Sequence, residues 1–503
     1  MSQLKDRYRA VVEGEVSCFD RVVINGTLTE ICHKAAMAQF LLSHEERILD
    51  LPRVFEPMKA EIVANAKAIA SAHGLKIEYI VRRNFRKEKR VREILAERGD
   101  KPGLVHIFSA VERVNTFRAG VRRKDGRPFI APRQGKCLHY YFYFIDSDFG
   151  LCYLRAPTWA PYRLQFYFNG HNWLARRLDE EGIDFTLIDN AFVSIADIDR
   201  AQAIADAFPV RALHTRLDDL ARLLCPVIRH FHSGYHWSLM QVEYATDLIF
   251  TSVEALAPLY DHLVRTAAHA VKVDQIATFL GRRLDARFTG EIGNRFHTRI
   301  EGTSIKHHMG RASIKMYDKF GRVLRIETTV NDVTIFKHHR MVEHRDGTQS
   351  MKTAPVKKNI YSLGIMAELM AAANRRYLDF LAALDDPSDG ARKLPKVAKP
   401  VRRDGRSHRG FNLFQAEDLD IFLAIVRGEF AITGFRNRDL RGHLGKTSHQ
   451  VSRILKRLRL HGLIKIVGKR YKYYLTRLGK SVVSCALQLR EYLVIPALAA
   501  PTS

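Results

Sequence analysis

The sequence has little that would suit a secreted or membrane-spanning protein. It contains no C-x-x-C pair, and its cysteines stand singly at Cys18, Cys32, Cys137, Cys152, Cys225 and Cys485. This spacing argues against a disulfide framework or a structural zinc site and favours a reducing compartment. No run of 18 uncharged apolar residues occurs, and the charged N-terminus lacks an apolar core. We therefore expect a cytoplasmic protein without a membrane partner.

Acidic residues are scarce relative to basic ones. The 503 residues include 81 Lys and Arg but 54 Asp and Glu, which gives a formal net charge of +27. An excess of this size predicts a polyanionic partner, and the lack of apolar spans favours nucleic acid over anionic lipid. The hydrophobic share of 46% is ordinary for folded proteins and excludes wholesale disorder.

Hydrophobic periodicity predicts an α+β multidomain protein. Residues 1–235 mix helical patterns with aromatic strands and form a mixed α/β N-terminal region. Residues 236–390 begin with a strand at 240–250, continue through short strands at 296–330 and end in an amphipathic helix at 362–384. A basic, proline-containing stretch at 391–410 predicts a flexible linker, and residues 411–503 form a last domain. We find no internal repeat in the sequence.

The last domain has the pattern of three short helices followed by a hairpin. Helices are expected at 416–426, from 434 onwards and at 448–460, with strands at 463–467 and 471–475. Between residues 441 and 480 there are twelve Lys and Arg and no Asp or Glu. This arrangement resembles a winged helix-turn-helix DNA-binding domain. The alternative is a protein–protein module with a solvated basic face.

The winged-helix resemblance implies a set of DNA contacts. The helix at 448–460 would be the recognition helix, with Gln450 and Arg453 placed for base edges and Lys456 and Arg457 on the same polar face. Lys469 and Arg470, between the two strands, would contact phosphates.

The region from Glu301 to Thr329 combines a tyrosine with bases and carboxylates. Strand alternation places Lys315, Tyr317 and Lys319 on one face, and Arg325 and Glu327 of the next strand on the polar side. A phenol, several cations and a carboxylate suit attack on a phosphodiester, with the tyrosine oxygen as nucleophile and a divalent metal on the carboxylates. The alternative is that Tyr317 is an ordinary half-exposed aromatic residue.

The pattern G-T-x₆-G-x-x-S-x-K-x-Y-D-K, followed by L-R-I-E-T-T, resembles the nicking core of rolling-circle replication initiators of plasmids and filamentous phages. The resemblance covers about residues 241–330 and implies that Tyr317 becomes linked to a 5′ phosphate. It also implies an acidic strand, which Glu243 and Asp247 would supply. Mg²⁺ or Mn²⁺ would then bind Glu243, Asp247 and Glu327, and His308 could act as a further ligand or proton-transfer group. The overall architecture resembles bacterial mobile-element proteins, which implies a nucleoid-associated location.

Other clusters remain as alternatives. His230 and His232 form a His-x-His pair that could bind metal, although the following Ser-Gly favours a loop. Asp20, Asp146 and Asp148 at strand ends could hold two metals, but a turn is the simpler reading of the last two. Basic runs at 82–92 and 118–124, interleaved with Phe85 and Phe117, indicate nucleic-acid contacts or solvated surfaces; the first supplies Arg82, Arg83, Arg86 and Lys87.

Together these patterns predict a DNA-binding protein of a mobile element or replicon that nicks one strand through a tyrosine with a divalent metal. It would be a replication initiator or a transposase. The alternatives are a non-catalytic winged-helix regulator and a partner of a structured RNA.

Overall fold

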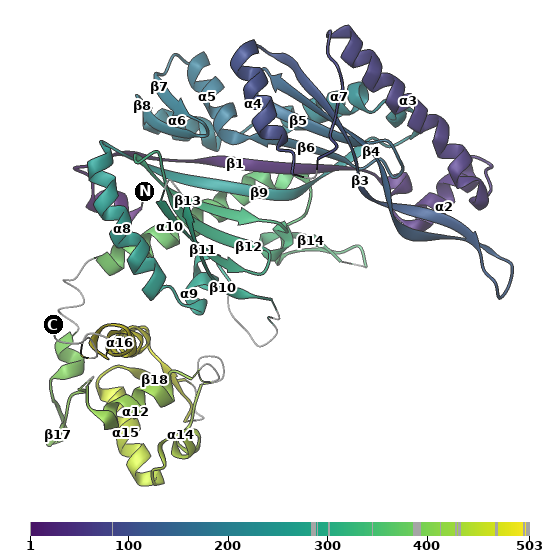
Figure 1. Ribbon diagram of the computed structural model, residues 1–503. Coiled ribbons are helices and arrows are strands. Elements are labelled where there is room, and N and C mark those ends of the chain that lie inside the picture. Colours follow the sequence, from purple (N-terminus) through teal and green to yellow (C-terminus); the bar gives the residue numbers. More distant parts are fainter. Residues whose placement is uncertain are drawn as a thin grey trace. The chain divides into compact units, whose positions relative to one another are not determined.

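A computed structural model describes residues 2–82, 84–282, 288, 290–299, 302–344, 346–385, 394–412, 414–427, 430, 434–467, 471–495 and 498. The chain divides into two compact units (Figure 1). The first comprises residues 1–261, 279–281 and 292–378, and the second comprises 262–278, 282–291 and 379–503. None of the helices described is both long and apolar enough to cross a bilayer.

The first unit is mixed α/β and is built on one eleven-stranded sheet, in which only the β2–β3 pair is parallel. The strand order is β10-β11-β12-β13-β9-β1-β6-β5-β4-β3-β2. The strands are β1 (Val12–Leu28), β2 (Glu78–Tyr79), β3 (Gly103–Val121), β4 (Pro128–Asp146), β5 (Gly150–Pro157), β6 (Leu164–Asn169), β9 (Tyr235–Phe250), β10 (Ile292–Arg299), β11 (Gly302–Met309), β12 (Ala312–Lys319) and β13 (Val323–Val330).

The sheet consists of two halves with the same connectivity. In the first half, β1 is followed by α2 (Lys34–Ser43), α3 (Leu51–Ala72) and α4 (Lys87–Arg98), and then by the meander β3 to β6, which returns to pair with β1. In the second half, β9 is followed by α8 (Val253–Ala270) and α9 (Val273–Phe279), and then by the meander β10 to β13, which returns to β9. The antiparallel β1–β9 pair joins the halves. The expected boundary at residue 235 therefore lies at the start of a central strand.

Helix α10 (Leu363–Asp385) covers one face of the second half (Figure 1). Its predicted apolar stripe is confirmed, because Met366, Met370 and Tyr377 are fully buried. Asn374 fixes the helix to the sheet: its amide donates to the Tyr244 carbonyl, and its carbonyl accepts from the Thr328 hydroxyl at 2.6 Å. Because α10 covers this face of β9 and β13, polar side chains that are to meet a ligand have to lie on the opposite face.

Helix α5 (Gly170–Glu180) begins where β6 ends and packs against β1. Asn169 caps it by accepting a hydrogen bond from the His171 backbone N–H at 2.8 Å. A Cβ on Gly170 would lie 2.2 Å from the Phe19 carbonyl oxygen, so only glycine permits this close approach. The remaining elements of this unit include α1 (Gln3–Arg7), β7 (Phe185–Ile188), β8 (Ala191–Ile195), α6 (Ile198–Asp206), α7 (Val210–Leu224), β14 (Lys337–Glu343) and β15 (Gln349–Pro355).

The second unit contains helices and short hairpins. Its elements are β16 (Val401–Arg403), β17 (Arg406–His408), α12 (Ala416–Ile425), α14 (Asn437–Leu444), α15 (Ser448–Leu460), β18 (Ile464–Ile466), β19 (Tyr473–Leu475) and α16 (Arg477–Gln488). Three helices and a hairpin thus occur in the predicted order. Thr447 caps α15, and the side-chain amide of Asn437 donates to the Ser448 carbonyl.

The described part of the expected linker, residues 394–410, is folded. Residues 394–398 are helical, and Val397 and Phe411 are buried in the core of the second unit. His461 bonds the carbonyls of Lys396 and Arg409 at 2.8 and 3.0 Å. The composition of this segment predicted a flexible linker because its few apolar residues, which anchor it to the core, are spread among many cations.

We expect Gly170→Ala to destabilise the first unit by about 1–3 kcal/mol, because the added methyl forces α5 away from β1. Gly364→Ala is the matched control, since a Cβ there meets nothing within 4 Å and alanine favours the helix by up to about 1 kcal/mol. Thermal unfolding of both variants checks the prediction. Equal midpoints for the two would contradict the close approach.

Candidate active site

Four adjacent strands, β12, β13, β9 and β1, place polar side chains on the face opposite α10. In the sheet register Lys315 lies opposite Glu327, and Tyr317 lies opposite Arg325, which in turn lies opposite Asp247. Directly opposed residues share a face, and so do alternate residues of one strand. The structure therefore brings together, on one face, these predicted residues: Lys315, Tyr317, Lys319, Arg325, Glu327, Glu243 and Asp247.

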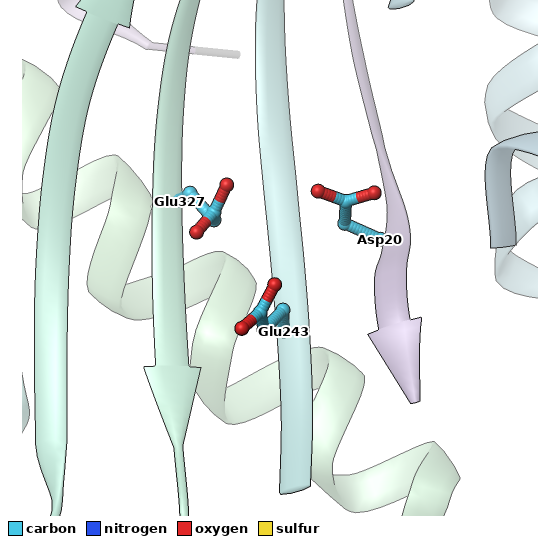
Figure 2. Close-up of side chains that lie close together, drawn as sticks. All are labelled: Asp20, Glu243 and Glu327. Atoms are coloured by element: carbon cyan, nitrogen blue, oxygen red, sulfur yellow. The ribbon is translucent and has the colours of Figure 1, made fainter. Parts of the chain in front are cut away.

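Strand β1 adds Asp20 to this face. Val16 lies opposite Asp247 and Cys18 lies opposite Ala245, so alternation along β1 places Asp20 on the same face. After Phe19 a β-bulge sets both Asp20 and Arg21 against Glu243 before the pairing resumes at Val22. Figure 2 shows the result, with Asp20, Glu243 and Glu327 converging from three strands.

Asp20, Glu243 and Glu327 form an acidic triad that could bind a metal ion. One carboxylate oxygen from each lies within 4.8 Å of the others, and Asp20 and Glu327 are buried while Glu243 is half-buried. Burial, with the charges of Glu327 and Asp20, raises the pKa of Glu243 to about 8. Carboxylates this close repel one another when ionised, so the triad favours a bound proton or a metal ion.

Asp20 is held in place by several donors. Its Oδ1 accepts hydrogen bonds from the side-chain amides of Asn169 and Asn190, each at 2.7 Å, and lies 3.4 Å from Nδ1 of His171. Burial opposes ionisation, but the neighbouring His171 and Arg325 side chains outweigh it and hold the pKa of Asp20 well below its usual range. The triad therefore contains one carboxylate fixed as an anion and one, Glu243, that readily takes a proton.

Asp247 does not belong to the triad. Both of its oxygens accept hydrogen bonds from Arg325 at 2.6 Å, and both side chains are fully buried. Arg325 lies directly opposite Asp247 on β13, so the sheet register itself brings the ion pair together without a ligand. The expectation that Asp247 is a metal ligand is corrected accordingly, since coordination would break a buried ion pair. Arg325 acts as a positioning residue whose Nη1 lies 3.5 Å from Asp20.

His171 is a buried member of the site that sequence reasoning missed. Its Nε2 lies 2.9 Å from Nη2 of Arg325, and its Nδ1 faces Asp20. The residue comes to the site because Asn169 and Gly170 begin α5 directly beside β1. Asn169 before glycine marks a strand end in the sequence, but no local pattern identifies His171.

Tyr317 contacts the triad directly. Its hydroxyl donates a hydrogen bond to Oε2 of Glu327 at 2.5 Å, and Nζ of Lys315 lies 3.7 Å from the centroid of its ring. Burial and the charge of Glu327 raise the pKa of Tyr317 well above its ordinary value. The phenol is therefore neutral, and Glu327 is the group placed to receive its proton.

Two further predicted residues lie beside the site. Lys319 is hydrogen-bonded to Oδ1 of Asn190 and lies 3.6 Å from Asp189, so it fixes the turn between β7 and β8. His307 bonds the Tyr377 hydroxyl on the α10 side, and His308 lies opposite Ser313 on the polar face. His308, which was expected as a further ligand or proton-transfer group, is thus on the polar face but is not part of the acidic triad.

The competing clusters have other partners. His230 pairs with Glu61 at 2.9 Å, away from the triad. Asp146 accepts hydrogen bonds from the backbone N–H groups of Asp148 and Phe149 and pairs with Arg216, which confirms the turn. The sequence therefore placed the three triad residues in two separate hypotheses: Asp20 with Asp146 and Asp148, and Glu243 and Glu327 with Asp247.

The predicted DNA-binding residues fall into three groups. The first group is exposed and consists of Arg82, Arg86, Gln450, Arg453 and Lys456. Within it, the side-chain oxygen of Gln450 accepts a hydrogen bond from the Thr447 backbone N–H and so helps to cap α15. Lys87 and Arg457 are turned inward. Nζ of Lys87 lies 4.1 Å from the Tyr141 ring centroid, and Arg457 donates to both oxygens of the buried Asp418. Arg83, Lys469 and Arg470 lie outside the described residues.

The prediction that Arg457 contacts DNA is therefore corrected, because its side chain is buried. Its guanidinium lies 3.8 Å from the Phe411 ring centroid and donates to the carbonyls of Arg409 and Gly410. Helical spacing placed Arg457 beside Arg453 and Lys456, but it lies at the edge of the polar face, where the folded 394–410 segment covers it.

Comparison with known proteins identifies no relative: no family model matches the chain, and no curated protein or solved structure matches it significantly. What the site can do therefore has to be argued from its own geometry.

We expect the protein to bind Mn²⁺ at the acidic triad. In calorimetric titrations, Asp20→Asn, Glu243→Gln and Glu327→Gln should each weaken binding at least about tenfold, because each removes an anionic oxygen ligand. Since Glu243 is protonated below its raised pKa of about 8, binding should tighten from pH 6 to pH 9 and release a proton.

Asp199→Asn, at an exposed position in the first turn of α6, is the matched control and should bind as the wild type does. Unchanged Mn²⁺ affinity in the Glu243→Gln variant would rule out the triad as the metal site.

Proposed function

We propose that the protein nicks one strand of DNA, with Tyr317 as the nucleophile and a divalent metal on Asp20, Glu243 and Glu327. The observation that carries the proposal is the 2.5 Å hydrogen bond from the Tyr317 hydroxyl to Glu327. One carboxylate is thereby shared between a potential nucleophile and a potential metal site, a combination suited to metal-assisted attack of a tyrosine on a phosphodiester.

In the proposed reaction Glu327 takes the phenolic proton, and the Tyr317 oxygen attacks the phosphorus. A bond forms between that oxygen and the 5′ phosphate, the bond from phosphorus to the 3′ oxygen breaks, and the leaving oxygen takes up a proton. Lys315, beside the Tyr317 ring, offsets charge on the phosphoryl oxygens. A metal held by the triad would supply Lewis-acid stabilisation of the same charge and lower the pKa of the phenol.

The ligand set favours Mg²⁺ or Mn²⁺. All three groups are carboxylates, and hard divalent cations prefer oxygen ligands, whereas zinc prefers sites that include nitrogen or sulfur.

The second unit would bring the protein to its DNA. We propose that α12, α14, α15 and the β18–β19 hairpin form a winged helix-turn-helix domain with α15 in the major groove. Arg453 and Lys456 support this assignment, because they are exposed on one face of α15 while Val451, Leu455 and Leu458 anchor the other face in the core.

A non-catalytic DNA-binding regulator is the second candidate. The specific observation in its favour is the high pKa of Tyr317, since a buried, neutral phenol is a poor nucleophile unless a cation activates it. A regulator would bind DNA through α15 and leave it intact with any metal. Binding to a structured RNA is a third candidate, and competition between RNA and duplex DNA separates it from the other two.

We expect a covalent protein–DNA adduct with Mn²⁺ or Mg²⁺ on single-stranded DNA pools or on supercoiled plasmids that carry the gene and its flanking DNA. Tyr317→Phe should abolish the adduct, and Glu327→Gln should slow its formation at least about 10³-fold, because the nucleophile or its base is lost. Denaturing electrophoresis with labelled DNA measures both effects.

Tyr79→Phe, at an exposed tyrosine, is the matched control and should form the adduct normally. An adduct that forms equally well with Tyr317→Phe would refute the catalytic assignment, and DNA binding without any adduct would favour the regulator.

We expect Arg453→Ala/Lys456→Ala to weaken binding to duplex DNA and to reduce the slope of log K against log salt by about 1 to 2, as expected when phosphate contacts are lost. Arg402→Ala/Arg403→Ala removes the same charge from the exposed strand β16 and should have a smaller effect. Fluorescence anisotropy at several salt concentrations measures the difference. Equal effects of the two variants would contradict the assignment of α15 to the groove.

A further inference from the structure

Strands β3 and β4 form a long two-stranded ribbon. Each strand has 19 residues, and their pairing extends from Gly103–Ile145 at one end to Val121–Pro128 at the other. Strand β5 pairs with β4 only from His139 to Asp146, so residues 111–138 continue beyond it as two strands. We call residues 111–138 the β3–β4 ribbon. Figure 1 shows it projecting from the sheet as a hairpin.

The ribbon is strongly basic and its cations are largely uncompensated. Residues 111–138 contain eight Lys and Arg but two acidic residues, Glu112 and Asp125. Among the described residues, only Arg127 of these eight has a carboxylate within 4.0 Å, at 3.9 Å. The other seven are exposed: Arg113, Arg118, Arg122, Arg123, Lys124, Arg133 and Lys136. Exposed cations that lack a neighbouring carboxylate in the protein are available to bind an external polyanion.

One face of the ribbon carries an ordered polar set. Arg113 lies directly opposite Lys136, and Asn115 lies directly opposite Gln134, with all four side chains exposed. Like charges directly opposed in a sheet are destabilising, so the fold alone does not explain the Arg113–Lys136 pair. Two cations beside two amides are the side-chain types that contact phosphates and the edges of guanine and adenine.

The ribbon is built to remain separate from other strands. Pro128 and Pro132 on β4 lack a backbone donor, and exposed cations also discourage edge-to-edge pairing. The ribbon is nevertheless anchored, because the Thr116 hydroxyl donates to the Ala160 carbonyl at 2.7 Å. Ile130, opposite Ala119, is buried, so the open part of the face shared with Arg113 is the stretch of residues 113–115 and 134–136. A firm, unpaired, basic ribbon is therefore presented to solvent.

We propose that the β3–β4 ribbon lies in the major groove of duplex DNA, with the face of Arg113, Lys136, Asn115 and Gln134 toward the bases and the cations near the hairpin end on phosphates. The major groove of B-form DNA, about 12 Å wide, admits a two-stranded ribbon. The major groove of duplex RNA is deep and narrow and does not. The inference rests on DNA as the substrate of the proposed function, but it does not require that the protein cleaves DNA.

The test uses the full chain and three probes of one sequence: duplex DNA, single-stranded DNA and duplex RNA. Arg113→Gln/Lys136→Gln should weaken binding to duplex DNA about tenfold and reduce the slope of log K against log salt by about 2, with a smaller effect on the other probes. Lys67→Gln/Lys76→Gln, which removes the same charge from exposed positions elsewhere in the unit, is the matched control and should bind as the wild type does.

A second measurement does not depend on affinity. A photo-crosslinker attached to Gln134→Cys should join the protein to duplex DNA, whereas the same group on Lys67→Cys should not. Unchanged affinity in the first variant, or no crosslink at Gln134→Cys, would overturn the proposal, as would an equal loss on duplex RNA. A crosslink to DNA without any Tyr317 adduct would leave the ribbon assignment standing while the nicking function fails.

Discussion

The antiparallel pairing of β1 with β9 determines the rest of the first unit. It joins two halves of the same connectivity into one sheet, and it places Asp20 beside Glu243 although 222 residues separate them in the chain. The register of this pairing puts Asp20 on the same face as Glu243, and a bulge sets Arg21 beside it. Without that pairing, neither the triad nor the close approach of α5 to β1 would form, because both depend on the course of β1 through the centre of the sheet.

The electrostatics of the site follow from this arrangement. Arg325 and Asp247 form a fully buried ion pair, and the same guanidinium lies 3.5 Å from Asp20. Positive charge therefore holds Asp20 ionised at one end of the triad, while crowding raises the pKa of Glu243 to about 8 at the other. The crowding of carboxylates extends to Glu327, which accepts a hydrogen bond from the Tyr317 hydroxyl. A divalent cation would relieve it, and this is why the proposed function joins the tyrosine and the metal in one centre.

Local patterns in the sequence predicted the parts of this site that one hairpin encodes. Alternation alone placed Lys315 and Tyr317 on one face, and the next strand contributed Glu327, as the register confirms. The parts that failed depend on distant pairing. Asp247 was expected to bind metal because alternation cannot show that Arg325 lies opposite it, and Asp20 joins Glu243 only through the distant pairing of β1 with β9. The duplicated topology was likewise missed, because the halves share connectivity but not side chains: the second supplies Glu243 and Glu327, and the first has a cluster of tyrosines that includes Tyr141, Tyr153 and Tyr167.

The central claim is that the triad is a metal site adjoining Tyr317. Anomalous diffraction from crystals soaked in Mn²⁺ tests it most directly, because it locates the ion without reference to activity. The account predicts a peak about 2.0–2.6 Å from oxygens of Asp20, Glu243 and Glu327. A Mn²⁺ peak elsewhere in the protein, with none among these three carboxylates, would contradict it.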